Sequence, residues 1–470
     1  MAINMTKLLK KRNANTSPTS NDQHIMRHYI LRIIMLAIPI ALQNLINVGV
    51  SVTDTLMIGS ISEEQMSGIS YANQPYFIFT TVLFGLASGS IVLTAQYWGK
   101  RELEPIRAIL GLMLRIGVVA GFLVSLFVLI SPETAMSIFT NEPEIIVYGT
   151  KYLRIVGFSY MFSGFTGVYL MSMRSTGNVY VSACIYGISF ILNVFLNWTL
   201  IFGHFGMPRM EIQGAATATL ISRILESLLT VGYMYCLEKK IHFKLKDLFH
   251  KTRKYWSNLV RFSIPVLLSE VCWGVGISVQ AAIIGRLGKS AITASSYINQ
   301  VQQLAGIILI GFGVGAGIVM GNIIGEGKEK EALQISRVLL KVSAVLGAIV
   351  AAAVIAFRPI APNFINCSSE TAVMIQNMLF GAAYLLFFQA FTILTMAGIL
   401  RGSGDTIYCT TLDVLTLFVL KLGLGIFVSK VLKLPPVVVY FILCSDEMIK
   451  TILTVPRILK GKWIHHTTVN

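Results

Sequence analysis

Residues 39–59 read PIALQNLINVGVSVTDTLMIG, and residues 265–285 read PVLLSEVCWGVGISVQAAIIG. The two stretches align without a gap, so Pro39 meets Pro265 and Gly59 meets Gly285, 226 residues later. The same register continues through Ser70, Tyr71, Asn73 and Gln74 onto Ser296, Tyr297, Asn299 and Gln300, and through Gly85, Gly89 and Gly99 onto Gly311, Gly315 and Gly325. The chain therefore contains an internal repeat. In an apolar chain this is typical of secondary transporters, whose substrate path lies between the repeats.

The composition is that of a membrane protein. Hydrophobic residues make up 54% of the chain and charged residues 13%, and the mean hydropathy is +0.70. A soluble domain carries about 25% charged residues. Only helices and closed barrels satisfy their backbone polar groups in lipid, and apolar runs of about 20 residues have the length of membrane-spanning helices.

The apolar runs predict an all-α polytopic membrane protein with twelve transmembrane helices in two parallel six-helix repeats that form a two-lobed bundle. We expect spans at 31–58, 70–97, 106–131, 146–172, 179–203, 213–236, 257–285, 295–324, 333–357, 372–400, 407–430 and 435–458. The predicted organisation is a flexible cytoplasmic leader (1–27), an N-lobe (28–237), a cytoplasmic connector (238–256), a C-lobe (257–458) and a cytoplasmic tail (459–470).

The net charge of +16 is explained by membrane topology rather than by nucleic-acid binding. Lysine and arginine gather before the first span and in the connector 238–256, whereas the opposite connectors 60–68 and 132–145 have none. The positive-inside bias places both termini in the cytoplasm, and we expect a multi-pass protein of the cell (inner) membrane. Attraction to anionic lipid headgroups is a secondary effect of the same charges.

Sequence motifs of nucleotide-driven pumps and of metal-dependent enzymes are missing. There is no GxxxxGK[ST] phosphate loop and no HExxH, and no histidine lies well inside a predicted span. The cysteines show no disulfide or metal-ligand spacing. We therefore expect a protein that is not an enzyme, has no cofactor, and draws its energy from an ion gradient, a partner or the gradient of the solute itself.

Ionisable residues inside the spans are the candidate functional residues, because each costs at least about 2.5 kcal/mol in the hydrocarbon layer. Asp54 lies in the first span, and its repeat counterpart is Gln280. A carboxylate in one lobe opposite an amide in the other suits a cation-coupling site, with Na⁺ as one possible ion. The alternative is a carboxylate that only hydrogen-bonds within the bundle.

Glu270 is the corresponding charge of the second repeat, where the first repeat has Asn44. It follows Pro265 by five residues, and a proline inside a helix frees a backbone carbonyl. The first hypothesis is a substrate or second charge site. The second is an ion pair with Lys421, which lies well inside the eleventh span.

Asn193 and Asn197 are four residues apart in the fifth span and so share one helix face. Their side-chain carbonyl oxygens could bind a hard cation. The alternative is that the two residues only form hydrogen bonds between helices, which are common in membrane proteins.

Two further motifs repeat between the halves. RSTGN at 174–178 pairs with RGSGDT at 401–406, and here we expect a helix stop at glycine with Arg174 and Arg401 facing the lipid phosphates. The alternative is a direct role in substrate handling. Arg223 with Glu226, and Glu447 with Lys450, are spaced as salt bridges within one helix.

These motifs together resemble the MATE (multidrug and toxic compound extrusion) family. The resemblance rests on VTDTLMIG at 52–59, GLASGSIVLTAQYWGK at 85–100, RSTGN at 174–178, NVFLNWTLIFG at 193–203, GAATATLISR at 214–223 and RGSGDT at 401–406. It covers the chain from about residue 30 to residue 458 and implies two six-helix lobes that rock around a central cavity.

The resemblance implies export of organic, often cationic compounds in exchange for Na⁺ or H⁺. It implies cation coupling at Asp54, Asn193 and Asn197, and it matches Glu270 more loosely. Some family members carry an acid in the tenth helix, where this chain has only Gln389.

From the sequence we therefore expect an antiporter for small organic molecules that acts as a monomer in the lipid bilayer. Asp54, Asn193 and Asn197 would couple the cation, and Glu270, Gln280, Lys421 and Gln389 would line the substrate or second charge site. Pro39, Pro265, Arg174 and Arg401 would have structural or gating roles. The alternatives are a lipid or polysaccharide-precursor flippase of the same superfamily, and a non-transporting membrane receptor or scaffold.

Overall fold

The computed structural model describes residues 20–249, 252–365 and 367–468, and all regular structure in these residues is helical. The first repeat forms α2 (Ser20–Gly59), α3 (Glu63–Gly99), α4 (Leu103–Ile130), α5 (Pro132–Ser137), α6 (Pro143–Val156), α7 (Ser159–Met173), η1 (Arg174–Thr176), α8 (Tyr180–Phe202), α9 (Ile212–Gly232) and η2 (Tyr233–Leu237), and the connector holds η3 (Leu245–Phe249). The second repeat forms α10 (Arg253–Gly285), α11 (Lys289–Gly325), α12 (Glu329–Phe357), η4 (Ala361–Phe364), α13 (Ser369–Thr392), η5 (Ile393–Leu400), α14 (Thr406–Thr416), η6 (Leu417–Leu424), η7 (Phe427–Val431), α15 (Pro436–Leu443) and α16 (Asp446–Lys460).

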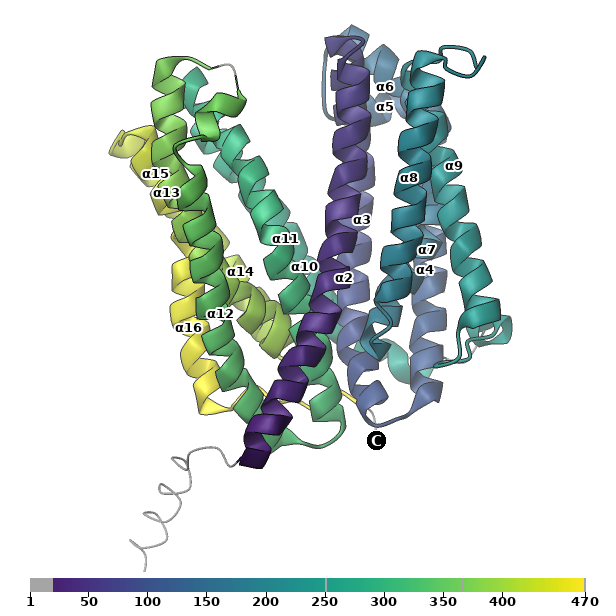
Figure 1. Ribbon diagram of the computed structural model, residues 1–470, viewed down its shortest axis with the longest axis vertical. Helices are drawn as coiled ribbons and strands as arrows, with labels where there is room; N and C mark the ends of the chain where they lie inside the picture. Colours follow the sequence, from purple (N-terminus) through teal and green to yellow (C-terminus); the bar gives the residue numbers. More distant parts are fainter. Residues whose placement is uncertain (1–19, 250–251, 366, 469–470) are drawn as a thin grey trace, which may run out of the picture.

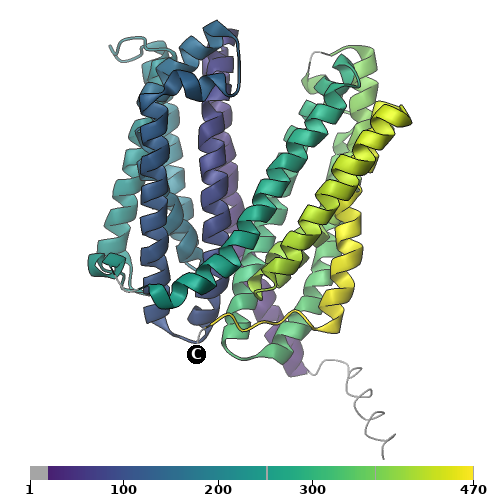
Figure 2. The same cartoon turned by 180° about the vertical axis from the view of Figure 1, so that it is seen from behind.

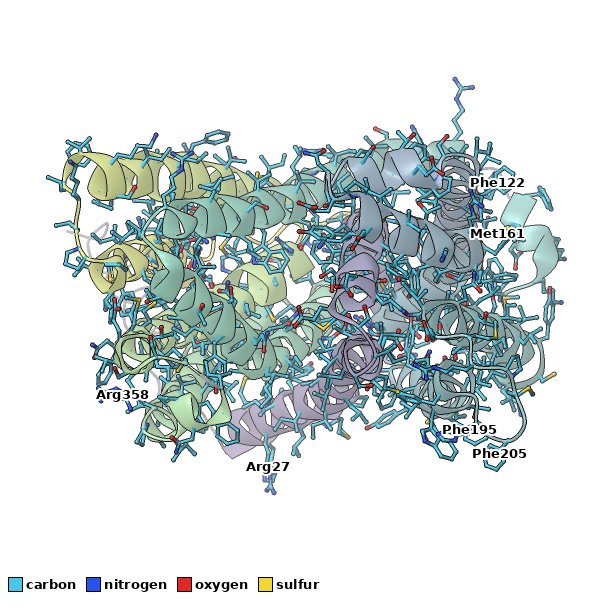
Figure 3. The ribbon with its side chains drawn as sticks, turned by 90° about the horizontal axis from the view of Figure 1, so that it is seen from above. Arg27, Phe122, Met161, Phe195, Phe205 and Arg358 are labelled. Atoms are coloured by element: carbon cyan, nitrogen blue, oxygen red, sulfur yellow. The ribbon has the colours of Figure 1, made fainter. Side chains whose placement is uncertain are left out.

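The helices confirm a twelve-helix membrane bundle. Within the described residues, ten helices are long and apolar enough to span a membrane, and α6 and α7 form an eleventh span bent by 60°. The predicted span 435–458 is divided into α15 and α16, which have 8 and 15 residues and so are each too short to be counted as a span. Large apolar side chains such as Phe122, Phe195 and Phe205 point outward from the bundle, as expected for a lipid-facing surface (Figure 3).

The first helix begins before the predicted span. Residues 20–27 of the predicted leader are already helical in α2, and residues 1–19 lie outside the described part of the chain.

The two repeats form two lobes that meet at one end and diverge toward the other (Figure 1). We call these the closed end and the open end. The chain leaves α16 at the closed end, where α2 also begins. Two long helices hold the lobes together, because α2 packs on α8 and on α11, and α10 packs on α14 and on α3.

Glycines at repeat-related positions make this contact possible. A Cβ added to Gly89 on α3 would lie 2.3 Å from Ser263 Cα on α10. At the equivalent place, a Cβ on Gly315 of α11 would lie 3.1 Å from the Ile33 carbonyl oxygen of α2. The backbones therefore touch almost directly at both places.

The same relation holds nearer the closed end. An added Cβ would lie 2.2 Å from the Asn322 carbonyl oxygen at Gly99, and 2.1 Å from the Gln96 carbonyl oxygen at Gly325. Because Gln96 and Asn322 are themselves repeat partners, these contacts are two copies of one interaction. The internal repeat in the sequence is thus a twofold relation between the lobes.

Residues 461–468, the C-terminal strap, run from α16 across the closed end toward the other lobe (Figure 2). The strap turns at Gly461, which has a φ of 72°, and buries Trp463 against the C-lobe. Its backbone is held by Ser403, whose carbonyl oxygen accepts from the His465 amide at 3.2 Å.

A side chain of the N-lobe forms hydrogen bonds with the backbone of the strap at His465 and Thr467. Gln96 on α3 donates to the His465 carbonyl oxygen at 3.0 Å and accepts from the Thr467 amide at 2.9 Å. Asn258 on α10 donates to the Thr467 carbonyl oxygen at 3.2 Å. The strap therefore connects the two lobes at the end where they are already closed.

The glycine contact gives a testable prediction. In Gly89→Ala the new methyl group meets backbone that cannot move aside, and overpacking of this kind costs about 1–3 kcal/mol. We expect the lobes to part at the closed end. Spin labels on the exposed Glu102 and Lys330, one on each lobe, should then show longer distances by pulsed electron paramagnetic resonance.

The matched control is Gly167→Ala on α7, where an added Cβ has nothing within 4 Å. This variant should keep the wild-type distances. Equal distances in Gly89→Ala and wild type would show that the contact does not set the lobe arrangement.

Candidate functional site

Asp54 lies on α2 inside the N-lobe and is 3% exposed. Asn197 Nδ2 on α8 donates to its Oδ1 at 2.5 Å, and Thr219 Oγ1 on α9 donates to its Oδ2 at 3.4 Å. Three helices thus converge on one buried carboxylate. Both carboxylate oxygens therefore accept hydrogen bonds from neutral side chains.

Asn193 completes this cluster. Asn197 Nδ2 also donates to Asn193 Oδ1 at 3.2 Å, and Asn193 Nδ2 donates to Thr219 Oγ1 at 3.5 Å. The Asn197 Oδ1 atom is buried and has no hydrogen-bond partner in the described part of the chain. The three residues predicted from the sequence therefore come together, and they offer oxygen ligands to a proton or a hard cation.

Sequence reasoning missed two residues of the N-lobe cluster. Thr219 and Arg223 are one turn apart on α9, within the GAATATLISR motif. Arg223 forms the predicted pair with Glu226, with both bonds at 2.9 Å, lies over the Tyr76 ring at 5.5 Å and is within electrostatic reach of Asp54. The i, i+4 spacing places Thr219 and Arg223 on one face of α9, and this shared face was the sequence signal for a polar surface directed toward Asp54.

In the C-lobe, the predicted pair of Glu270 with Lys421 is wrong. Glu270 Oε1 accepts from Arg401 Nη1 at 2.9 Å, and Arg401 also lies 3.8 Å from Asp413. Lys421 meets α10 near Gly276, where an added Cβ would lie 3.8 Å from its Nζ. Gly276 is six residues beyond Glu270, about 9 Å along the helix, so Lys421 does not reach the carboxylate.

Lys421 belongs to a second part of the same network. Its Nζ lies 3.4 Å from Asp446 on α16, and Lys450 Nζ lies 3.3–3.4 Å from Asp413, Asp446 and Glu447. The C-lobe ion network thus consists of Glu270, Arg401, Asp413, Lys421, Asp446, Glu447 and Lys450. It has one more acid than base.

Gln280 and Gln389 take no part in the network. Gln280 is buried on α10, and Gln389 is half-buried on α13. On α13 the contact with the network comes from Thr392, which hydrogen-bonds to Glu447. The acidic side chain next to α13 is therefore Glu447 of α16, and α13 itself contributes none to the network.

The expectation that both motif arginines face lipid phosphates is wrong. The helix stop itself is present, because Gly177 caps the segment with a φ of 75°. Arg174, however, is 4% exposed and donates to Gln43 Oε1 on α2 at 2.8 Å, and the Arg401 side chain is 14% exposed. Both arginines therefore turn inward, Arg174 toward Gln43 on α2 and Arg401 toward Glu270 on α10.

Pro39 and Pro265 occupy equivalent positions inside α2 and α10. The Pro265 carbonyl oxygen accepts from Thr410 Oγ1 at 2.5 Å, which ties α10 to α14. Pro265 therefore lies beside a hydrogen bond between helices, close to Glu270 in the chain.

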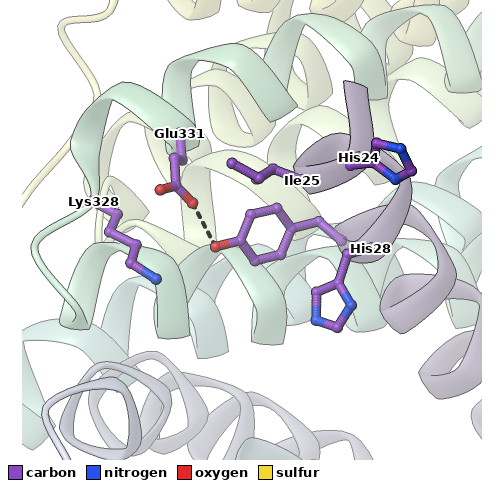
Figure 4. Close-up of a pocket in the computed structure, with 6 residues that line it drawn as sticks. His24, Ile25, His28, Lys328 and Glu331 are labelled. Carbon is purple, nitrogen blue, oxygen red and sulfur yellow. Dashed lines mark hydrogen bonds between the residues drawn. The ribbon is translucent and has the colours of Figure 1, made fainter. Parts of the chain in front are cut away.

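A pocket of about 350 Å³ lies at the closed end, away from both clusters (Figure 4). It is lined by His24, Ile25, His28, Tyr29, Lys328 and Glu331. The Tyr29 hydroxyl donates to Glu331 at 2.6 Å and so joins α2 to α12. None of the residues predicted to be functional lies in this pocket.

Comparison with known proteins agrees with the fold and the repeat. The probable multidrug resistance protein NorM of Thermotoga maritima is 24% identical over 436 residues, which cover 92% of each chain. The FAD transporter of Shewanella oneidensis is 24% identical over 314 residues, 64% of this chain and 67% of that protein. The outward-facing structure of a multidrug resistance MATE family transporter has a TM-score of 0.82 at 17% identity and covers 92% of this chain and 96% of that one.

The MatE family model matches the chain twice, at residues 39–199 and 265–427. Each match begins at the proline that opens a repeat. Members of this family are transporters rather than enzymes. The chain belongs to the MATE family of multidrug efflux transporters.

Proposed function

We propose that this protein is a secondary active antiporter that exports organic, drug-like cationic compounds in exchange for Na⁺ or H⁺. The observation that carries the proposal is the buried carboxylate of Asp54, held by Asn197 and Thr219. The names of the relatives support it, because the Thermotoga maritima protein is called a probable multidrug resistance protein.

The coupling step follows from the hydrogen bonds of Asp54. A proton or Na⁺ that binds the carboxylate competes with the donors Asn197 and Thr219 for its oxygens. Losing either bond changes how α2 packs on α8 and α9. Because α2 also packs on α11 of the other lobe, the change alters the relative stability of two lobe arrangements.

The proposed orientation follows from the positive-inside bias. The closed end, where α2 begins and the strap runs, would face the cytoplasm of a cell with the protein in its inner membrane. The lobes then diverge toward the outside, so this arrangement would release substrate outward (Figure 1).

The C-lobe ion network would be the second charge site. Its excess acid means that one proton or cation can bind there without creating a net positive charge. Glu270 lies at its α10 end and Asp446 and Glu447 at its α16 end, so binding would affect packing between these helices.

Efflux of ethidium tests the coupling role of Asp54. We expect Asp54→Asn to lose efflux from loaded, energised cells at wild-type protein levels, because the neutral amide cannot bind a proton or stabilise Na⁺. Sodium and pH are varied separately, so that dependence of wild-type efflux on one of them identifies the coupling ion.

Two threonines on α9 provide a matched control. Thr219→Ala removes a hydrogen bond to Asp54 and should alter the ion dependence, whereas Thr217 bonds only to the Gln213 carbonyl oxygen of its own helix. Thr217→Ala should behave as wild type. Full efflux by Asp54→Asn would remove Asp54 from the mechanism, and no efflux by wild type would favour the flippase alternative.

Thermal unfolding in detergent tests whether the C-lobe charges act as one unit. Arg401→Gln leaves the Glu270 carboxylate buried without its base, and we expect a loss of about 3–5 kcal/mol. The double variant Glu270→Gln/Arg401→Gln should lose less than Arg401→Gln alone. Additive losses would show that the two residues are independent.

A further inference from the structure

Arg174 is a buried cation whose hydrogen-bonding groups are mostly unused. It lies at the start of η1 and is 4% exposed. A guanidinium has five N–H donors, and only Nη2 donates to a protein group, Gln43 Oε1 at 2.8 Å. Within the described residues, its Nε has no partner and no carboxylate forms an ion pair with it. A buried charge without a counter-ion destabilises the folded protein, and a bound anion would remove this cost.

The internal repeat supplies the comparison. Arg401 is the equivalent arginine of the C-lobe, and it is neutralised by Glu270 at 2.9 Å and Asp413 at 3.8 Å. Glu270 corresponds to Asn44 in the register of the first repeat, and Asp413 corresponds to Tyr186 in the register of the RSTGN and RGSGDT motifs. Both carboxylates of the C-lobe are thus neutral residues in the N-lobe.

We infer that Arg174 binds an oxyanion, the carboxylate or phosphate group of a transported organic compound, at the base of the N-lobe. The inference rests on the proposed export function and adds to its substrates compounds that carry such a group. The free edge of the guanidinium can pair with two oxygens at once, a geometry that carboxylates and phosphates share.

The surroundings of Arg174 show how a ligand reaches it. The η1 segment packs against α3 of its own lobe and against α11 of the other lobe. When the lobes part at the closed end, α11 moves away and this side of η1 is uncovered. Arg174 is then reached from the closed end, the side from which an exporter takes its substrate.

A soluble compound fits this position better than a lipid headgroup. Arg174 and its partner Gln43 are 4% and 2% exposed, and they lie between helices rather than on the lipid-facing perimeter. A headgroup phosphate would have to leave the membrane surface to reach them.

Equilibrium binding of radiolabelled inorganic phosphate to the purified full-length protein in a maltoside detergent tests the proposal, with benzoate as a competing carboxylate. Wild type should bind phosphate saturably, and Gly89→Ala should bind it more tightly because its lobes part. Arg174→Gln should bind it roughly tenfold more weakly or worse, since it loses a charge-assisted interaction.

Gln43→Glu is the variant that separates a ligand site from a structural arginine. The substitution is nearly isosteric and puts a carboxylate where Gln43 Oε1 now lies 2.8 Å from Arg174. It should keep the fold, raise the melting temperature and abolish phosphate binding, because the arginine then has an internal counter-ion as Arg401 does.

Phosphate binding that is equal in wild type, Arg174→Gln and Gln43→Glu would overturn the proposal. Binding that appears only when phosphatidic acid is added, and not with soluble phosphate or benzoate, would also overturn it. The proposed antiport is tested separately by ethidium efflux. No anion binding by wild type together with normal efflux rejects only the Arg174 site, and saturable anion binding by wild type without efflux rejects only the antiport.

Discussion

Close backbone contact between the lobes is the constraint on which the structure depends. Gly89 lets α3 touch α10, and Gly315 lets α11 approach α2 in the same way. Because α2 and α10 also carry Asp54 and Glu270, the helices that join the lobes are the helices that hold the candidate charges. A change in charge can therefore reach the lobe interface without a long path through the protein.

The two lobes share a fold but differ in electrostatics. In the N-lobe, Asp54 accepts hydrogen bonds from neutral side chains, so its charge is open to a small cation. In the C-lobe, the acids are held by Arg401, Lys421 and Lys450 in one continuous network. Duplication gave both halves the same backbone, and substitutions such as Asn44 for Glu270 and Asp54 for Gln280 separated their chemistry.

Much of this could be predicted from the sequence, because it depends on spacing along one helix or between exact repeats. Spacing alone predicts the repeat, the helices and the grouping of Asn193 with Asn197. The family resemblance predicts that Asp54 belongs to the same site as these two asparagines. The pairing of Glu270 was not predictable in this way. Six other charged residues compete for partners in the C-lobe ion network. Their positions along the helices and around the bundle decide that Arg401 reaches Glu270 while Lys421 reaches Asp446.

The direction of Arg174 and Arg401 was missed for a related reason. A glycine stop after an arginine predicts where a helix ends, and Gly177 confirms that. It carries no information about which neighbouring helix lies beside the end. The C-terminal strap was also beyond sequence patterns, since Gln96 binds backbone groups of His465 and Thr467, and backbone groups leave no trace in residue identity.

The strap has a consequence for the order in which the molecule is built. Residues 461–468 leave the ribosome after every helix of both lobes has been synthesised. Each lobe can therefore insert and pack in the membrane before the strap reaches Gln96 on the other lobe. The hydrogen bonds between the strap and Gln96 therefore form between two lobes that can already be folded.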